Sequence, residues 1–206
     1  MGRDEGVDES KRATLRRFAA VGAASPLVGL AGGREGDGDS DARDAIAGYL
    51  ATTPGAHFSK IRDDLKLGTG ETQYHLKRLT EDGVVESTRD GDYRRFFPEG
   101  RFTAFDQTVL GFLRRETPRG IVLALLGDPE ASAGDIAADL DVSRPTVSKY
   151  AAKLDEAGVL SRENGYELVE PEKTLLLVVR YADSLGPDAE TLANDAASLL
   201  SYDPTS

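Results

Sequence analysis

Apolar residues follow a helical spacing in two stretches of the chain that align with each other without a gap. Residues 61–85 read IRDDLKLGTGETQYHLKRLTEDGVV, and residues 136–160 read IAADLDVSRPTVSKYAAKLDEAGVL. The identical positions, mostly apolar, are Ile61/Ile136, Asp64/Asp139, Leu65/Leu140, Leu79/Leu154, Glu81/Glu156, Gly83/Gly158 and Val84/Val159. An internal repeat of this kind predicts two copies of one small helical unit rather than a catalytic centre.

Each copy is typical of two helices separated by a short turn. In the first copy, residues 61–65 place two apolar side chains on one helix face, and residues 66–68 form the turn. The second helix is expected to start at an N-cap hydroxyl, Thr69 in the first copy and Ser143 in the second, because that oxygen accepts a bond from a free backbone N–H. The glycine shared by both copies is expected to end it in a left-handed conformation. This order of elements predicts a helix-turn-helix.

A β-hairpin is predicted after each copy. Asp90-Gly91 and Asn164-Gly165 stand between β-favouring runs, where such dipeptides are strong hairpin signals. A leading helix is expected before each copy, over residues 41–52 and 119–126. A helix-turn-helix that is followed by a two-stranded hairpin is a winged helix.

The expected fold class is therefore mainly α with small β-hairpin wings (α+β). Two winged helix-turn-helix domains lie in tandem and are joined by a helix, and further helices follow them. The expected ranges are an N-terminal basic helix with a flexible acidic linker at 1–40, domain 1 at 41–98, a connector helix at 99–116, domain 2 at 117–170 and a C-terminal helical segment at 171–206.

These motifs resemble a known group of proteins. Residues 54–86, with TGETQYHLKRL in the second helix, resemble winged-helix regulators common in halophilic archaea, in which a TGxxQYHLxxL helix recurs. Residues 141–168 resemble the broader ArsR/MarR/IclR-like winged-helix class. The resemblance covers roughly residues 41–170 and implies transcription regulation through binding to double-stranded DNA.

Composition restricts the chemistry. The chain has no cysteine, which excludes disulfides and thiolate zinc sites. It has no phosphate-binding glycine loop, nucleophile elbow or histidine metal motif, so we expect no enzyme activity, no cofactor and no metal. The formal net charge of −11 is unusual for a DNA-binding protein. Either the protein does not bind nucleic acid, or it works in molar salt, where the Debye length falls to roughly 3 Å. An aspartate-rich, lysine-poor composition favours the second interpretation, a halophilic protein.

Cationic and polar residues gather where a duplex would dock. The candidates in domain 1 and its wing are Thr69, Glu71, Gln73, Tyr74, Lys77, Arg78, Arg89, Arg94 and Arg95. Those in domain 2 are Ser143, Arg144, Thr146, Ser148, Lys149 and Lys153. Glutamine pairs with adenine, and arginine or lysine pairs with guanine. Arg144, at the start of its helix, is the strongest candidate for a base contact, whereas His75 is expected to pack inside the domain.

The N-terminal segment has two interpretations. Arg16-Arg17 precedes a stretch of small residues, which resembles a twin-arginine export signal. The same residues suit a basic amphipathic helix that docks on DNA, on a partner or on the body of the protein. The apolar stretch is too short and too rich in glycine to span a membrane, so we expect no stable membrane insertion and a cytoplasmic location.

The C-terminal segment predicts helices over residues 172–185 and 188–201. Five consecutive apolar residues, 175–179, wrap more than one helical turn, so the second helix or another subunit must cover part of them. We expect a homodimer. The alternative functions are a winged-helix protein–protein interaction module that does not bind DNA, and a membrane-tethered or exported protein.

Overall fold

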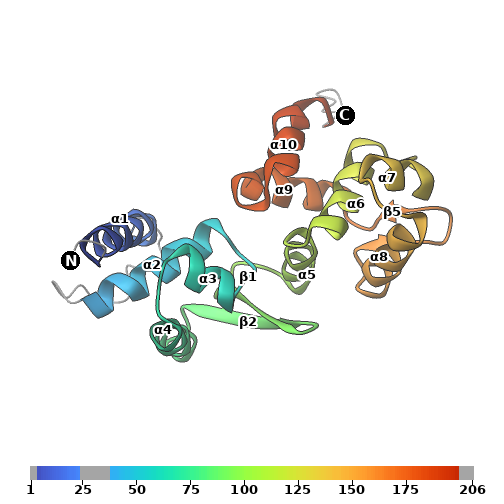
Figure 1. The fold of residues 1–206 in the computed structure, drawn as a ribbon. Helices are drawn as coiled ribbons and strands as arrows, with labels where there is room; N and C mark the ends of the chain where they lie inside the picture. Colours follow the sequence, from blue (N-terminus) through green and yellow to red (C-terminus); the bar gives the residue numbers. More distant parts are fainter. Residues whose placement is uncertain (1–3, 24–37, 200–206) are drawn as a thin grey trace, which may run out of the picture. The chain divides into compact units, whose positions relative to one another are not determined.

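The computed structural model describes residues 4–23 and 38–199, with side chains over residues 9–21 and 41–196. The chain divides into two compact units, Met1–Thr103 and Ala104–Ser206 (Figure 1). Helices predominate in both, and the strands form small antiparallel sheets. The expected fold class is confirmed. Part of the segment expected to hold the N-terminal helix and linker, residues 24–37 of 1–40, lies outside the described residues.

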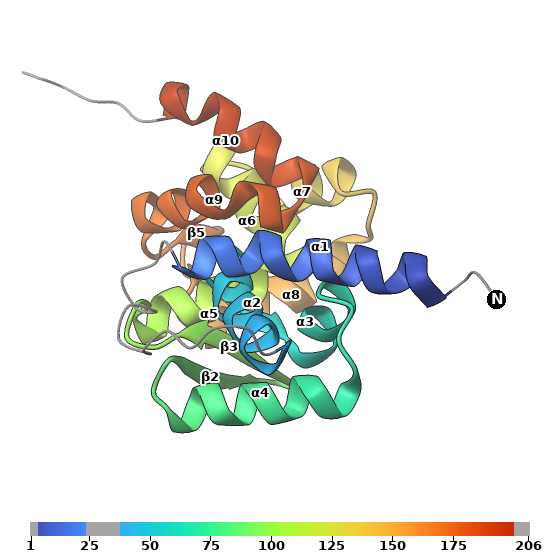
Figure 2. The ribbon, with the colours of Figure 1, turned by 90° about the vertical axis from the view of Figure 1, so that its left-hand side faces the viewer.

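The first unit is a winged helix-turn-helix with an additional helix at its N-terminal end. Its helices are α1 (Asp4–Ala23), α2 (Gly38–Thr52), α3 (Phe58–Asp64) and α4 (Thr69–Glu81). Its strands, β1 (Ala56–His57), β2 (Val85–Asp90) and β3 (Tyr93–Pro98), form a sheet in the order β1-β3-β2. In this unit α1 lies along α2, and α4 runs beside the β2–β3 hairpin (Figure 2).

The core of this unit collects the apolar faces that the sequence pattern predicts. Ile46 and Leu50 of α2, Ile61 of α3 and Leu79 of α4 are all buried. The hairpin turns through two residues, since Asp90 pairs with Tyr93 in the β2–β3 register. Its first turn residue is a glycine with a φ of 59°.

The two turns inside the helix-turn-helix copies share a backbone conformation as well as a sequence pattern. Lys66 has a φ of 56°, and Asp141, at the corresponding position of the second copy, has a φ of 50°. The glycines that end the second helices, Gly83 and Gly158, also have positive φ, as expected. The repeat therefore extends to the local geometry of the chain.

The second unit repeats the plan with a shorter hairpin. Its helices are α5 (Ala104–Leu113), α6 (Glu116–Gly127), α7 (Ala133–Asp139), α8 (Arg144–Glu156), α9 (Pro171–Leu185) and α10 (Pro187–Leu199), and its strands are β4 (Leu160–Ser161) and β5 (Glu167–Leu168). The helix expected as a connector is α5, and it belongs to this unit, where Leu110 and Leu113 are fully buried.

Helix α6 lies very close to the turn that follows α7. A Cβ atom built on Gly120 would lie 2.4 Å from a methyl carbon of Leu140. Such an approach is possible only where residue 120 has no side chain.

Arginines fasten the C-terminal helices to the rest of this unit. Arg114 donates hydrogen bonds to the backbone oxygen and the hydroxyl of Ser184. Arg119 pairs with Asp188 at 2.7 Å. In the apolar run, Leu175 and Val178 are buried, whereas Leu176 is 62% exposed. Val179 is exposed as well, so the run is covered on one face of α9, against which α10 packs.

Candidate nucleic-acid interface

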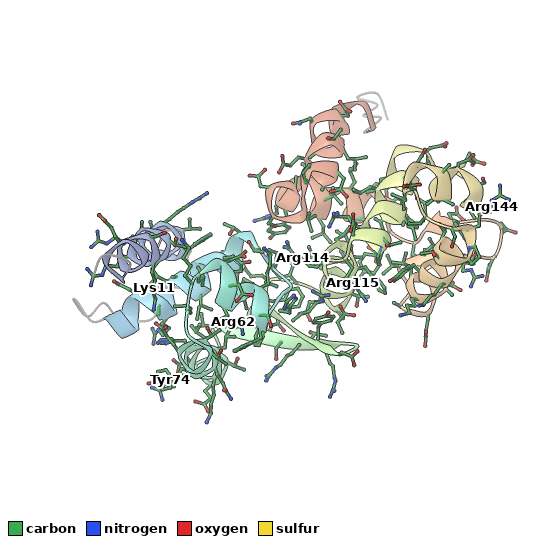
Figure 3. All side chains as sticks on the ribbon, viewed as in Figure 1. Lys11, Arg62, Tyr74, Arg114, Arg115 and Arg144 are labelled. Carbon is green, nitrogen blue, oxygen red and sulfur yellow. The ribbon has the colours of Figure 1, made fainter. Side chains whose placement is uncertain are left out.

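Helix α4 has one buried face and one exposed polar face. Its buried residues are Thr72, His75, Leu76 and Leu79. The opposite side presents the exposed side chains of Gln73, Tyr74, Lys77 and Arg78. Tyr74 is 52% exposed and points away from the body of the unit (Figure 3). The expectation that His75 packs inside the domain is confirmed, since it is 3% exposed.

The first turn of α4 differs from the expected cap. Gly68, not Thr69, is the N-cap residue, and the Glu71 carboxylate accepts its backbone N–H at 3.0 Å. Glu71 also pairs with Lys11 of α1 at 3.0 Å. Burial opposes the charged carboxylate, but the Gly68 N–H and the Lys11 ammonium outweigh it and lower the pKa of Glu71. Glu71, proposed as a DNA contact, is therefore held in a cap and an ion pair, and Thr69 is an exposed residue of the first turn.

Two of the three arginines proposed on the first wing are exposed, and they lie opposite each other. Arg89 of β2 pairs with Arg94 of β3 in the antiparallel register. Like charges directly opposite each other on a sheet repel. Arg94 is held in place by a hydrogen bond that its Nε donates to Ser87 Oγ at 2.8 Å. The wing thus holds two cations side by side at its surface.

Arg95, the third arginine, is not available at the surface. It is 2% exposed, pairs with Asp90, and donates from Nη1 to the backbone oxygen of Gly55 at 3.0 Å. Successive residues of a strand point to opposite faces, so Arg94 shares a face with Phe96 and is exposed, whereas Arg95 lies on the other face and is buried. The expectation that Arg95 contacts DNA is wrong, because its guanidinium lies inside the unit and links the wing to the segment before β1.

Helix α8 of the second unit begins at the expected cap. The hydroxyl of Ser143 accepts the backbone N–H of Thr146, and the two hydroxyl oxygens are 2.9 Å apart. Pro145 stands in the first turn, where its missing N–H leaves no helical bond unmade. The buried residues of α8 are Val147, Ala151 and Leu154. Ser143 and Thr146, both proposed as DNA contacts, also hold this cap together.

Arg144 lies across the start of α7. A Cβ atom built on Gly134 would lie 2.8 Å from its Nη2 atom, so the absence of a side chain at Gly134 makes room for the guanidinium. Arg144 is nevertheless exposed and stands at the outer edge of the unit (Figure 3). Hydrogen bonds from the hydroxyl and the backbone of Ser132, with Arg144 nearby, lower the pKa of Asp135.

The remaining cations of α8 surround an aromatic ring. The Nζ atoms of Lys149 and Lys153 lie 5.9 and 5.7 Å from the centre of the Tyr150 ring, and both lysines are exposed together with Ser148. Arg162, which follows β4, is also exposed and was not proposed from the sequence. The sequence signal for Arg162 is its position in the predicted second hairpin, because Arg89 was proposed from its position in the first.

The N-terminal segment forms a helix that packs on the first unit. Leu15 of α1 is buried in the core, and Phe18 meets Tyr49 edge to face with ring centres 5.2 Å apart. Lys66, in the turn before α4, donates a hydrogen bond to Ser10. Arg16 and Arg17 lie on the exposed side of this helix. These contacts are those of a helix docked on the body of the protein. They match the second interpretation of this segment rather than the export signal.

Over residues 4–23 and 38–199, no helix combines the length and the apolar character needed to cross a bilayer. In the same described ranges, no histidine, aspartate and glutamate side chains gather into a group that could hold a metal ion.

A capped second helix with an exposed polar face, followed by a hairpin, defines each unit as a domain of the helix-turn-helix class. Family comparisons agree with this assignment. A family described as an N-terminal HTH domain matches residues 40–110, and a family described as winged helix-turn-helix DNA-binding matches residues 114–161. The chain is a tandem helix-turn-helix protein, and its class is that of DNA-binding regulators. Searches of curated proteins and of solved structures found no match.

Proposed function

We propose that this protein is a cytoplasmic, sequence-specific transcription regulator that reads duplex DNA with α4 and α8. The observation that carries the proposal is the cross-strand pair of Arg89 and Arg94. Two opposed arginines destabilise the free hairpin, and a phosphate between them removes the repulsion. The wing would therefore hold the DNA backbone while the exposed faces of the helices meet base edges.

Specificity would come from the polar residues on the exposed helix faces. Gln73 suits a bidentate contact with adenine, and Arg144 suits guanine. Tyr74 would contact a phosphate or a thymine methyl group. The other proposed contacts are Thr69, Lys77, Arg78, Ser148, Lys149 and Lys153, all of which are exposed.

The acidic composition fits this role in concentrated salt. The net charge of −11 would repel DNA at low ionic strength, but at about 1 M salt the repulsion fades within roughly 3 Å. Close contacts such as those of Arg89 and Arg94 then decide binding. We therefore propose that the protein works in a halophilic cytoplasm.

The test starts from a binding site selected from random duplexes in molar salt. Affinity is then measured by fluorescence anisotropy over a range of salt concentrations. Arg144→Ala should cost about 1–3 kcal/mol on the selected site and relax specificity at one position. Arg89→Ala should weaken binding to all sequences and reduce the salt slope by about 1. If no duplex is enriched and neither substitution changes binding, the protein–protein module becomes the better interpretation.

We also propose a homodimer through the exposed face of α9. Glu172, Leu176 and Arg180 are exposed and follow one another at intervals of four residues. In an antiparallel two-fold pairing centred on Leu176, Glu172 would meet Arg180 of the partner subunit, and the same contact would occur twice. Leu176 would lose its exposed area at the axis.

Sedimentation velocity tests this pairing. Leu176→Glu should give a monomer, and Glu172→Arg should weaken the dimer because it sets two arginines opposite each other. The double exchange of Glu172→Arg with Arg180→Glu should restore it. Glu190→Arg on α10 changes the net charge equally and is the control. A dimer that ignores all of these substitutions would use another surface.

A further inference from the structure

A hollow lies between the recognition helix and the wing of the first unit. It has a volume of about 420 Å³, is open to solvent on one side, and is bordered by α4, by the first residue of α3 and by β3. Its apolar lining comes from Phe58, Leu76 and Phe96, of which Leu76 and Phe96 are buried. This volume and lining suit a small organic molecule.

The rim of the hollow is cationic on balance. Lys77 and Arg94 both line it, and Glu81 is the one carboxylate among its lining residues. Lys77 Nζ lies 3.7 Å from Glu81 Oε1, and both side chains are more than half exposed. An exposed ion pair of this length is weak and exchanges readily for a better partner.

Arg94 is already positioned over the aromatic lining. Its guanidinium carbon lies 5.5 Å from the centre of the Phe96 ring, and its Nε is engaged by Ser87. Gln73, also at the rim, carries both donor and acceptor groups. The hollow thus combines an apolar lining with two cations and an amide, which together match an organic anion.

The second copy of the repeat lacks these features. The positions that correspond to Phe58, Leu76, Lys77 and Thr80 hold Ala133, Ala151, Ala152 and Asp155. The helix-turn-helix is built in both copies, so the fold does not require the aromatic wall or the cation. Phe58 and Phe96 also pack on the core of the first unit, so what distinguishes this copy is an open apolar surface with Lys77 and Arg94 at its rim.

We propose that the hollow binds a small apolar carboxylate, with its hydrocarbon body against Phe58 and Phe96 and its carboxylate between Lys77 and Arg94. Gln73, Lys77 and Arg94 are also proposed DNA contacts, so the anion and the duplex would compete for them. The protein would then release DNA when the carboxylate accumulates. This regulatory consequence rests on the proposed function, whereas binding of the anion does not.

Fluorescence titration with 2-naphthoate tests the site without DNA. The full chain should bind it saturably, and amide resonances of Leu76 and Phe96 should shift in NMR spectra. Thr80→Leu places a larger side chain in the hollow and leaves the backbone hydrogen bonds of α4 intact. It should weaken binding of 2-naphthoate at least about tenfold. Lys77→Gln should weaken it by about tenfold, the usual effect of losing one charge-assisted hydrogen bond. Asp155→Leu, the matched change in the second copy, should have no effect.

Three results would overturn the proposal. They are the absence of saturable binding, equal loss in Thr80→Leu and Asp155→Leu, and amide shifts that lie away from α4 and β3. The amide shifts are measured on the unmodified chain, so they decide the question even where Thr80→Leu fails to fold. A separate anisotropy experiment with the selected duplex shows whether naphthoate displaces DNA. Failure to bind any duplex would remove the regulatory consequence and leave the anion site standing.

Discussion

The ammonium of Lys11 lies 3.0 and 3.2 Å from the two carboxylate oxygens of Glu71. These residues are far apart in the chain, and the pair joins α1 to the first turn of α4. The same carboxylate caps that turn through the backbone N–H of Gly68. The position of the proposed recognition helix is thus linked to the N-terminal helix through one side chain.

The charge of Glu71 should make the first unit sensitive to acid. Its pKa in the folded state lies below the ordinary value of 4.5, so its contribution to stability is present above that value and is lost as the pH falls through the lowered pKa. We expect Glu71→Gln to reduce the free energy of unfolding by about 1 kcal/mol at neutral pH. The difference should shrink towards about pH 3.5. Urea unfolding at both pH values measures it, and a difference that does not change with pH would contradict a charged cap.

Substitution of Arg95 should lower stability, whereas substitution of Arg89 should lower DNA affinity. Removing a buried, paired arginine is strongly destabilising, so Arg95→Ala should cost about 3 kcal/mol of unfolding free energy. Arg89→Ala, on the exposed side of the wing, should change stability by less than about 0.5 kcal/mol and act on DNA affinity instead. Thermal unfolding and anisotropy on the same two proteins check this. Equal stability of the two variants would contradict the buried role of Arg95.

His57 should make the first unit less stable below neutral pH. Its Nδ1 accepts the backbone N–H of Lys60 at 3.3 Å and so caps α3. Burial, and then the charges of Arg95 and Lys60, lower its pKa below the ordinary 6.5. The unfolded chain therefore binds the proton more readily, and stability present above that value is lost as the pH falls below it.

The matching substitution is His57→Asn, since asparagine caps a helix without titrating. The unfolding free energy of the natural chain should fall between about pH 7.5 and about pH 5, and that of the variant should fall less. Denaturant titrations across this range provide the measurement. Parallel pH profiles for the two proteins would rule out His57 as the titrating group.

The left-handed turn before α8 offers a stabilising substitution. Asp141 has a φ of 50°, which costs a residue with a side chain roughly 1 kcal/mol and costs glycine little. Asp141→Gly should therefore keep or raise the melting temperature. Ala138→Gly, inside the neighbouring helix, should lower stability by about 1 kcal/mol and serves as the control. A loss of similar size in both variants would contradict the inferred strain.

Local pattern predicted much of this molecule; of two errors, one depends on a long-range contact and the other on a contact within a turn. The faces of α4 and α8 could be read from the sequence because helical spacing alone decides them. The burial of Arg95 could not, because its acceptor at Gly55 lies in a distant segment. The N-cap of α4 is Gly68 rather than the expected Thr69, because the Glu71 carboxylate accepts the backbone N–H of Gly68. The hydroxyl of Thr69 was the more conspicuous capping group in the sequence.

The repeat also extends further than the most obvious sequence matches. Ile46 and Leu50 of α2 correspond to Ile121 and Leu125 of α6 at the same spacing along the chain, and all four are buried. Two identical apolar residues at helical spacing are common among unrelated helices. The match supports a duplicated helix only because all four residues are also buried. Burial shows that the duplicated unit includes the leading helix.

Gly120 limits whether the leading helices of the two halves, α2 and α6, can replace each other. Its counterpart in the first half is Ala45, and the counterpart of Leu140 is Leu65, both fully buried. A chimera that carried α2 in place of α6 would bring a methyl group to the point where Leu140 already fills the space. The reverse chimera would leave a void of one methyl group. Exchange of the leading helices between the two halves is therefore expected to lower stability in both directions, by overpacking in one chimera and by a void in the other.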